Sequence, residues 1–463
     1  MLLRGNGWSA DELFSLWQSD PQQAFASALH RILADSNPPL YPIALFIVRQ
    51  LPVEPRSSIL ITNGLAVLIG VFAVLMSARP AGLQRFAAVV CVALVFSGPV
   101  LRYMPEGRSY LMALMLVFVA SWLGAVAVED EGRRASWWGF AAVGCLAALC
   151  HVYAGLFCCC LAAGLMVASW RRRRWRLCRA GLALGLSSGS TLVAWYLWFG
   201  MHAAVNVLWL TFSVSSIGDV LLRYQSTAYG FVAIVAVFAA LLAASLFVRP
   251  TREMSIVLCV CLALFFLIPI AISLKTPIIS ARYWIIGTPV IIVFLSFWAR
   301  AAWAAGQARP RPARLAVGIG AAVFLVLADA GGFLQAQASM SQKLVWRGAP
   351  TVAPLLAGCP DASVHVNSPA GMDDDLAALS FGFVAHAPRG VFVSARSPAT
   401  GFSDASRPGC PVLGWAEHVG PMDGQTDGDR LRLLKINAAP AEVAILRHHG
   451  GYVVLQRSAA ADR

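Results

Sequence analysis

Charged residues are scarce in this chain. Only 13% of its 463 residues are Asp, Glu, Lys or Arg, whereas 58% are hydrophobic, and the mean hydropathy is +0.68. These values lie outside the range of ordinary globular domains, so water is not the main solvent of the folded chain. Many apolar runs reach or approach the ~20 residues that an α-helix needs to cross a bilayer, and their length without charge favours helices over barrel strands.

The sequence also lacks the cysteine pattern of a zinc or redox protein. No CxxC pair is repeated at zinc spacing, and nine of the eleven cysteines lie in or beside apolar segments, including the consecutive residues Cys158, Cys159 and Cys160. We interpret these nine as small buried hydrophobic residues. Residues 1–30 have no continuous apolar core, so no signal peptide is expected.

Positive charge is plentiful, but it is not arranged as a nucleic-acid site. The net charge is +13, and the arginines lie between apolar segments rather than on a soluble domain with interleaved aromatic residues. The densest run, Arg171 to Arg174 followed by Arg176 and Arg179, is typical of a cytoplasmic loop under the positive-inside rule. No nucleic-acid partner is expected.

The apolar runs predict about ten transmembrane helices. They lie near residues 57–78, 86–101, 110–128, 137–150, 152–169, 180–199, 226–248, 254–273, 283–299 and 315–334. Alternate connections hold the arginines, namely Arg79 and Arg85, Arg133 and Arg134, the run at 171–179, Arg249 and Arg252, and Arg300 to Arg314. We expect this side to be cytoplasmic, so that residues 102–109, 200–225, 275–280 and everything after about 335 face the periplasm.

The segment Pro39 to Leu51 decides where the N-terminus lies. It has about thirteen residues and begins among prolines, so it is too short to span comfortably and is interpreted as an interfacial or re-entrant helix. An extra crossing here would put residues 1–37 in the cytoplasm. We expect these residues to lie outside, because they have little excess positive charge.

Five short motifs follow one another along the chain. An acidic pair, Asp11-Glu12, is followed by Asp35-Ser36-Asn37-Pro38-Pro39-Leu40-Tyr41, and then by the stretch from Arg102 to Tyr110 with its Arg/Glu cluster. His151-Val152-Tyr153 and Arg282-Tyr283, with Pro289 beyond, come next. This order resembles the GT-C membrane glycosyltransferases related to protein mannosyltransferases and lipid A sugar transferases. Relatives normally have a transmembrane helix before the acidic pair, whereas only ten residues precede Asp11 here.

The resemblance implies a fold, a location and a reaction. The resemblance implies that the polytopic α-helical membrane fold is GT-C-like, whereas the small C-terminal α/β periplasmic domain is predicted from the pattern of the polar C-terminal sequence itself. The reaction would transfer a sugar from a polyprenyl-phosphate donor to a lipid, glycan or protein acceptor at the outer face of the bacterial inner membrane, with inversion expected. Membrane lipid would surround it, and a divalent cation is an open question.

The acidic pair is the candidate catalytic group. Asp11 would act as the general base on the acceptor hydroxyl, and Glu12 would orient it or help to hold a divalent ion. The alternative is that Asp11 is an N-cap carboxylate at the start of an interfacial helix. The resemblance adds Asp35 and Tyr41 as substrate-binding residues.

The candidate donor-binding groups are cationic and aromatic. Guanidinium groups match phosphate oxygens and stabilise the charge that develops on a leaving phosphate, which is the role expected of Arg102, Arg108 and Arg282. The alternative is snorkelling to lipid headgroups, and Lys275 could fill either role. Glu106 is either the counter-ion of the flanking arginines or a metal or acceptor contact, His151 is either a polar group near the phosphate or a packing residue, and Tyr283 accompanies Arg282.

The C-terminal part changes to mixed polar sequence. Short apolar runs such as Ser363 to Val366, Val391 to Val393 and Tyr452 to Leu455 predict strands with a few helices. Asp373, Asp374 and Asp375 are interpreted as helix N-terminal acids rather than metal ligands. In an oxidising periplasm Cys359 and Cys410 would pair. We therefore divide the chain into an external segment 1–56, a transmembrane domain 57–334 and a periplasmic domain 335–463 whose work would be acceptor recognition or shielding.

Two other classes of protein fit a multi-helix bundle. A transporter or flippase of an anionic lipid or solute predicts internal repeats and charges near the midplane of the membrane. No repeat is detected, and the polar residues gather at helix ends instead. A non-catalytic component of an assembly or export system would leave Asp11 dispensable.

Overall fold

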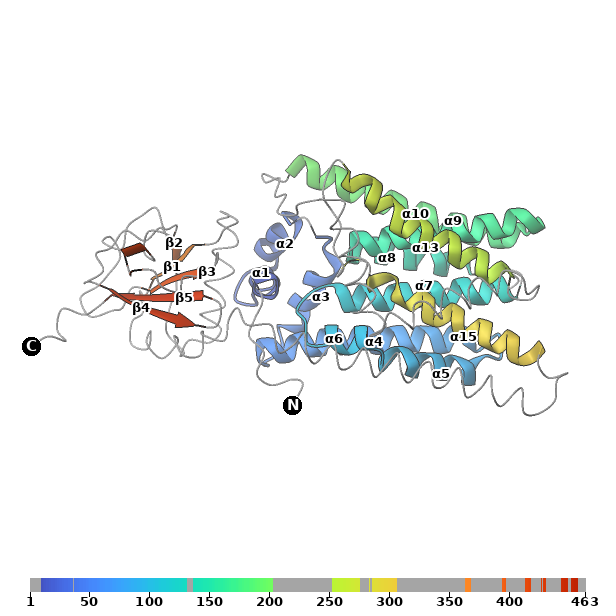
Figure 1. The fold of residues 1–463 in the computed structure, drawn as a ribbon, viewed down its shortest axis with the longest axis horizontal. Helices are drawn as coiled ribbons and strands as arrows, with labels where there is room; N and C mark the ends of the chain where they lie inside the picture. The colour runs from blue at the N-terminus through green and yellow to red at the C-terminus, as the bar shows by residue number, and fades with distance from the viewer. Residues whose placement is uncertain are drawn as a thin grey trace, which may run out of the picture. The chain divides into compact units, whose positions relative to one another are not determined.

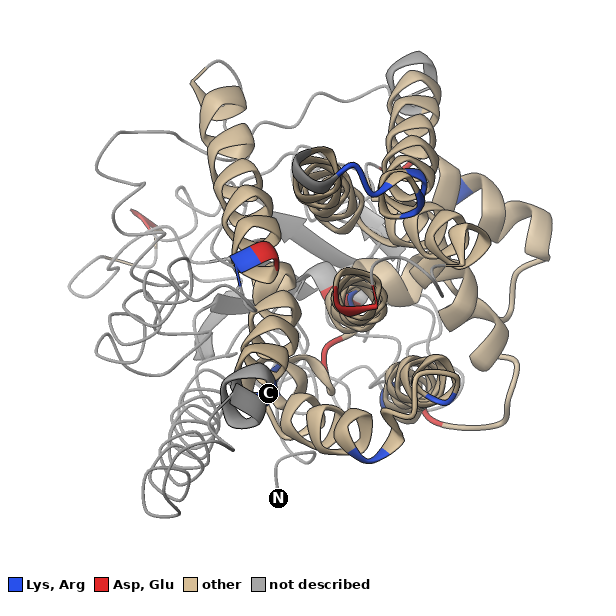
Figure 2. Cartoon of the chain, turned by 90° about the vertical axis from the view of Figure 1, so that its right-hand side faces the viewer, with Lys and Arg blue, Asp and Glu red and all other residues tan. Residues whose placement is uncertain are grey.

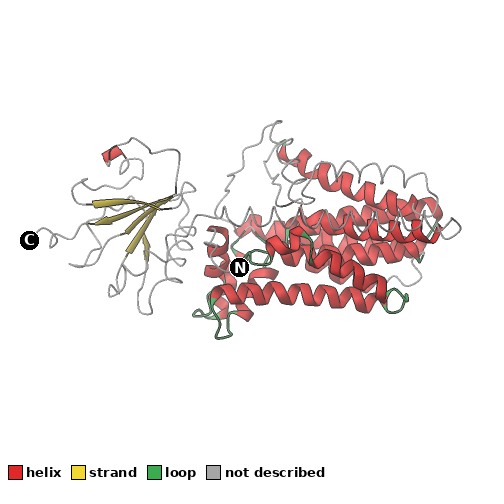
Figure 3. Ribbon diagram, turned by 60° about the horizontal axis from the view of Figure 1, so that its bottom comes forward, coloured by secondary structure: helices red, strands yellow, loops and turns green. Residues whose placement is uncertain are grey.

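The computed structural model describes two units of the chain. The described residues are 10–35, 37–130, 136–202, 252–274, 283, 285–305, 363–367, 394–396, 413–417, 426, 428–429, 443–448 and 451–456. One unit comprises Met1–Gln23 with Ser339–Arg463, and the other comprises Ala24–Ala338. The described elements of the unit Ala24–Ala338 are helices (Figures 1 and 3). The described elements of the other unit are the helix α1 (Ala10–Gln18) and the strands.

The described helices of the larger unit follow one another with short connections up to residue 202. They are α2 (Phe25–Leu33), α3 (Leu40–Val48), α4 (Pro55–Ala78), α5 (Gln84–Val95), α6 (Gly98–Tyr103), α7 (Tyr110–Glu129), α8 (Trp137–Cys150), α9 (Val152–Arg172) and α10 (Trp175–His202). Beyond residue 251 come α13 (Arg252–Ser273), the 3-10 turn η1 (Ile285–Gly287) and α15 (Thr288–Ala305). Together they form the helical bundle in Figure 1.

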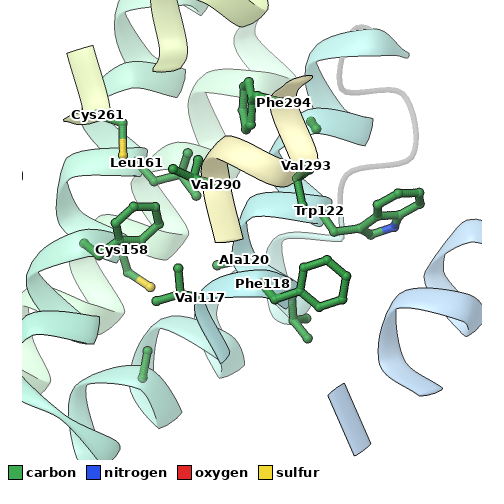
Figure 4. Packing of buried hydrophobic residues seen from close by; sticks show 14 of the residues in the cluster. Val117, Phe118, Ala120, Trp122, Cys158, Leu161, Cys261, Val290, Val293 and Phe294 are labelled. Atoms are coloured by element: carbon green, nitrogen blue, oxygen red, sulfur yellow. The ribbon is translucent and has the colours of Figure 1, made fainter. Parts of the chain in front are cut away.

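Helix α7 forms the centre of this bundle. It is apolar on every face, which is the pattern of a helix surrounded by protein, and it packs against α4, α8, α9 and α15. Its Phe118 and Trp122 are completely buried, and Figure 4 shows both residues with Leu161 of α9 and Phe294 of α15 in the same core. The core is therefore built from contacts between helices far apart in the sequence.

Small residues allow the outer helices to approach one another closely. A Cβ atom added at Gly164 of α9 would lie 2.6 Å from the backbone oxygen of Val257 in α13. Lipid tails are as apolar as the helix surfaces, so close van der Waals packing at glycine contacts is a main source of association between membrane helices.

Five of the described helices are long and apolar enough to cross a membrane, namely α4, α7, α9, α10 and α13. Three shorter apolar helices, at Gln84–Val95, Trp137–Cys150 and Ile285–Trp298, accompany them. The expectation of a polytopic helical membrane protein is thus confirmed. The expected spans at 226–248 and 315–334 lie outside the described residues, so the count of ten remains a prediction.

One expected span, at residues 86–101, is divided into two helices. The run at 86–101 is not a single helix, because α5 ends at Val95 and α6 begins at Gly98. Pro99 lies at the start of α6, where its missing N–H costs nothing, whereas inside a continuous helix it would remove a hydrogen bond and clash with the preceding turn. The chain therefore breaks at Ser97 before reaching the end of the bundle.

The proline-led segment forms a short helix, as expected. Helix α3 has nine residues, fewer than half of the ~20 needed to span a bilayer, and it packs against α4 and α8. Helix α2 contacts it through Phe25 and Phe46, whose ring centroids are 5.4 Å apart. The prediction that this segment is too short to span is confirmed.

Most of the described arginines of the helical unit lie at one of its ends. The helices run alternately in opposite directions, so the connections holding Arg79, Arg85, Arg174, Arg176, Arg179 and Arg252, and the last turns of α15 with Arg300, lie at the end that faces the viewer in Figure 2. Arg133, Arg134 and Arg249 lie outside the described residues. The other end collects the α6–α7 connection, the α8–α9 hinge and Tyr283.

The smaller unit contains a five-stranded mixed sheet. Its strands are β1 (Ser363–Asn367), β2 (Ser394–Arg396), β3 (Leu413–Glu417), β4 (Val443–His448) and β5 (Gly451–Gln456), in the order β2-β1-β3-β5-β4. Strand β1 pairs parallel with β2 and β3, whereas β5 pairs antiparallel with β3 and β4. The strands expected at Ser363 and Tyr452 are confirmed. Val391–Val393, Cys359, Cys410 and Asp373 to Asp375 lie outside the described residues.

Candidate active site

The α6–α7 connection, which holds three of the candidate residues, is braced from within the bundle. Asn63 of α4 is fully buried, and its Nδ2 group donates to the backbone oxygens of Tyr103 at 3.3 Å, Met104 at 2.9 Å and Glu106 at 2.9 Å. A buried backbone carbonyl without a donor costs free energy, so one carboxamide stabilises three groups of an irregular segment. Asn63 therefore gives the connection a defined conformation.

Arg102 stands at the start of this braced connection. It is half-buried in the last turn of α6, and its guanidinium carbon lies 5.6 Å from the centre of the Tyr103 ring. Among the described residues, no carboxylate lies within ion-pair distance of Arg102. Glu106 is thus not its salt-bridge partner. The guanidinium is held by the fold and remains able to bind an anion.

Glu106 and Arg108 complete the connection. Both are half-buried, and Glu106 contributes its backbone oxygen to the Asn63 contact. The connection ends at Ser109, and α7 begins at Tyr110. The backbone oxygen of Ser109 accepts a hydrogen bond from the thiol of Cys150 at 3.7 Å. This contact links the α6–α7 connection to the end of α8.

A cluster of aromatic rings surrounds His151. The ring of His151 lies 5.4 Å from Tyr110, 6.1 Å from Tyr153 and 5.6 Å from Tyr283, measured between centroids. Tyr153 and Tyr283 are 5.0 Å apart, and Tyr103 lies 5.1 Å from Tyr110. The cluster draws on α6, α7, α9 and the segment before α15, so it joins four parts of the sequence at one end of the bundle.

The local backbone explains why His151 has a preferred tautomer. His151 lies between α8 and α9 in an extended conformation, and its Nδ1 atom accepts a hydrogen bond from the backbone N–H of Tyr153 at 3.1 Å, as an N-cap side chain does. In the neutral ring the proton is then on Nε2, which makes that nitrogen a hydrogen-bond donor. His151 is buried and serves as both a helix cap and a polar group within the cluster.

The second acidic motif lies in the connection between α2 and α3. The Nδ2 group of Asn37 donates to both carboxylate oxygens of Asp35, at 3.3 and 3.2 Å, and Asp35 is half-buried. Tyr41, in the first turn of α3, is almost completely buried. Because α3 packs against the bundle, the motif is anchored near the end of α8.

The acidic pair lies in the first turn of α1, within the other unit. The helix begins at Ala10, so Asp11 is inside the helix rather than at its N-cap, and the N-cap interpretation is wrong in that respect. Glu12 is buried, and the side chain of Asp11 is outside the description. Lys275 and Arg282 also lie outside the described residues, whereas Tyr283 is half-buried in the aromatic cluster.

No metal centre is evident in the described part of the chain, where no three His, Cys, Asp or Glu side chains come together. The sequence analysis gave no role to three residues of this region. Tyr110 and Tyr153 were members of two of the motifs, and their aromatic character at helix starts was the available signal. Asn63 was overlooked although it is a polar residue within an apolar span, a position that commonly indicates function or a buried contact.

The described helices have the length and composition of a multi-pass membrane protein. Two solved structures share the architecture: ArnT from Cupriavidus metallidurans in the apo state, with a TM-score of 0.58, and ArnT bound to undecaprenyl phosphate, with a TM-score of 0.57. Each is 14% identical to this chain and is matched over 100% of this chain and 96% of its own length. No protein-family model matches the chain, and no curated protein matches it by sequence. The resemblance inferred from the motifs is therefore confirmed at the level of the fold.

Proposed function

We propose that this protein is a membrane glycosyltransferase that moves a sugar from a polyprenyl-phosphate donor to a lipid, glycan or protein acceptor. The observation that carries the proposal is the likeness to ArnT along the whole chain, including a structure of ArnT bound to undecaprenyl phosphate. The braced α6–α7 connection with Arg102 supports it, because such a donor presents a phosphate near the membrane surface.

Binding the donor phosphate requires cationic side chains that are not already paired with a carboxylate of the protein. Arg102 meets this condition, since no described carboxylate pairs with it. Arg108, on the same braced segment, would be a second phosphate ligand, and Arg282 and Lys275 are further candidates. A guanidinium next to the phosphate stabilises the charge that grows as the bond between the sugar and the phosphate breaks.

His151 would contribute a hydrogen bond rather than a charge. Its Nδ1 atom is occupied by the backbone of Tyr153, so the neutral ring offers Nε2–H to an oxygen of the donor. The rings of Tyr110 and Tyr283 flank it, and their apolar faces would exclude water from the phosphate. Asp35, in the connection between α2 and α3, and Tyr41, in α3, would also bind substrate.

The acceptor side needs a base. Asp11 would take the proton of the acceptor hydroxyl while its oxygen attacks the anomeric carbon, and the polyprenyl phosphate would leave with the electrons of the broken bond. Attack from the face opposite the phosphate inverts the anomeric centre. Glu12 would orient Asp11, and Glu106 would contact the acceptor or a divalent ion.

The proposed setting is the bacterial inner membrane with the arginine-rich end in the cytoplasm. The positive-inside rule supports this orientation, because most of the described arginines lie at one end of the bundle. The aromatic cluster would then face the periplasm. Residues 335–463 are proposed to be periplasmic because of the alternation of spans predicted from the sequence. There the sheet domain would recognise or shield the acceptor.

Asp11→Asn tests the base in membrane vesicles supplied with a panel of labelled polyprenyl-phosphate sugars. We expect sugar transfer to fall by a factor of roughly 100 or more, in the range of lost general-base catalysis. Asp20→Asn is the matched control, since the Asp20 carboxylate only accepts from the backbone N–H of Gln22 and should be dispensable. Full activity of a folded Asp11→Asn protein would remove Asp11 as the base. Movement of an intact lipid or solute without sugar transfer by the wild type would instead indicate a transporter.

A further inference from the structure

The turn between α9 and α10, at the arginine-rich end, has an unusual surface. We define the turn surface as Trp170, Arg173, Trp175, Arg176 and Arg179, all of which are exposed. Trp170 and Trp175 expose 87% and 73% of their area, although tryptophan is among the residues that gain most from burial. In a membrane protein, exposed tryptophans at helix ends lie where hydrocarbon meets the headgroups.

A second pair of exposed tryptophans, on the neighbouring helix α8, lies at the same end of the bundle. Trp137 and Trp138 are the first residues of α8, they are 50% and 68% exposed, and their rings stack with centroids 3.9 Å apart. Helices α8, α9 and α10 pack against one another, and all four tryptophans are at the same end. The three arginines of the turn surface therefore lie at headgroup depth.

Within the part of the chain that the structure describes, these three arginines have no counter-charge. Among the described residues, no carboxylate lies within ion-pair distance of Arg173, Arg176 or Arg179. The neighbouring Arg174 does have a partner, because its Nη1 atom lies 2.8 Å from Oε2 of Glu253 in α13. That pair fixes the turn to the bundle and leaves the positive charge of the other three uncompensated.

The backbone at Arg173 adds an independent indication. Its φ of 56° and ψ of 37° are left-handed, and Arg173 is the only non-glycine residue with positive φ among those described. The N–H groups of Arg173 and Arg174 bond to the oxygens of Trp170 at 3.3 Å and Ser169 at 3.0 Å, which is the helix ending normally made by glycine. Arginine is strained in this conformation. The position therefore retains a guanidinium where glycine would give a more stable turn.

We propose that the turn surface docks the headgroups of anionic phospholipids in the leaflet at the arginine-rich end. Guanidinium groups match phosphate oxygens, and basic clusters next to membrane helices attract anionic lipids. The tryptophans set the depth, and the Arg174–Glu253 pair holds the turn in place. This docking is separate from sugar transfer and does not depend on it.

Fluorescence quenching by brominated lipids tests the proposal on the full-length protein in vesicles. Brominated phosphatidylglycerol should quench the exposed tryptophans more efficiently than brominated phosphatidylcholine, and salt should reduce the difference. In Arg173→Gln with Arg176→Gln the relative binding constant for phosphatidylglycerol should fall by about fivefold for each arginine removed. Arg79→Gln with Arg85→Gln, at the same end but on the α4–α5 connection, is the matched control and should leave the quenching ratio unchanged.

Arg173→Gly separates lipid docking from a structural role. It removes the charge and relieves the left-handed strain, so the protein in neutral detergent should unfold at a higher temperature while its preference for phosphatidylglycerol decreases. Arg173→Lys should keep the preference. Equal quenching of the wild type by the two lipids, or an equal loss of preference in the control pair, would overturn the proposal.

Discussion

The Nδ2 atom of Asn63 lies 2.9 Å from the backbone oxygen of Glu106, across 43 positions of sequence. This contact, with those to Tyr103 and Met104, makes α4 the support of the segment that contains Arg102 and Arg108. The proposed phosphate site is thus held by a residue that would not itself touch substrate.

Asn63→Leu should weaken both the fold and the site. One buried and two partly buried carbonyls lose their donor, which we expect to lower the free energy of unfolding by about 2 to 3 kcal/mol and the activity by more than tenfold. Thermal unfolding in detergent and the transfer assay measure the two effects. The control is Thr62→Val, because the Thr62 hydroxyl bonds only to Ser58 within its own helix, and the change should cost less than about 1 kcal/mol. An Asn63→Leu protein with unchanged stability and activity would contradict the bracing role.

Arg102→Gln should affect donor binding rather than folding. Because no described carboxylate pairs with Arg102, its removal leaves no buried charge uncompensated, and the unfolding temperature should stay nearly constant. We expect KM for the donor to rise by about tenfold, the equivalent of about 1.4 kcal/mol of a charge-assisted hydrogen bond. Arg102→Lys should retain part of the affinity. Equal donor affinity in the wild type and Arg102→Gln would show that Arg102 only faces lipid headgroups.

The two ion pairs at the arginine-rich end should differ in strength. The Arg174–Glu253 side chains expose only 14% and 13% of their area, whereas Arg300 and Glu129, also 2.8 Å apart, expose 39% and 35%. Water screens the exposed pair, so Glu129→Gln should cost less than about 1 kcal/mol. Glu253→Gln leaves Arg174 partly buried without its partner and should cost about 2 to 3 kcal/mol. Double-mutant cycles on unfolding temperature measure both couplings, and equal values for the two pairs would contradict the argument.

Two glycines of long helices should respond in opposite ways to alanine. At Gly164 the new Cβ would meet the backbone oxygen of Val257 at 2.6 Å, so α9 and α13 must separate, at a cost of about 1 to 3 kcal/mol. At Gly64 of α4 nothing lies within 4 Å of the new atom, and the gain in helix propensity should stabilise the protein by up to about 1 kcal/mol. Thermal unfolding compares them. A stabilising Gly164→Ala would mean that these helices do not make close contact.

Helix positions were predictable because a bilayer imposes a length. The spans at 110–128 and 137–150 match α7 and α8 within a residue or so, since ~20 apolar residues between polar ends leave few alternatives. The break between α5 and α6 was missed although Pro99 marked it, because the apolar run continues through Ser97 without a charge. Composition alone does not distinguish one helix from two in such a run.

The site was predictable only in part. The order of the motifs predicted Arg102, His151 and Tyr283 as site residues. In the structure the ring centroids of His151 and Tyr283 are 5.6 Å apart. The same order gave no indication that Asn63 bonds to the segment after α6, because a hydrogen bond across more than forty residues depends on how α4 packs against its neighbours.

By itself the sequence determined that this is a helical membrane protein with most of its arginines on one side, because hydrophobic length and charge act locally along the chain. The motif order also predicted the GT-C architecture. The tertiary structure alone decided which polar groups meet: that Asn63 supports the α6–α7 connection, that the rings of Tyr110, Tyr153 and Tyr283 gather around His151, and that Arg102 and the arginines of the turn surface lack carboxylate partners among the described residues. These are contacts between distant segments, and they exist only once the helices have packed.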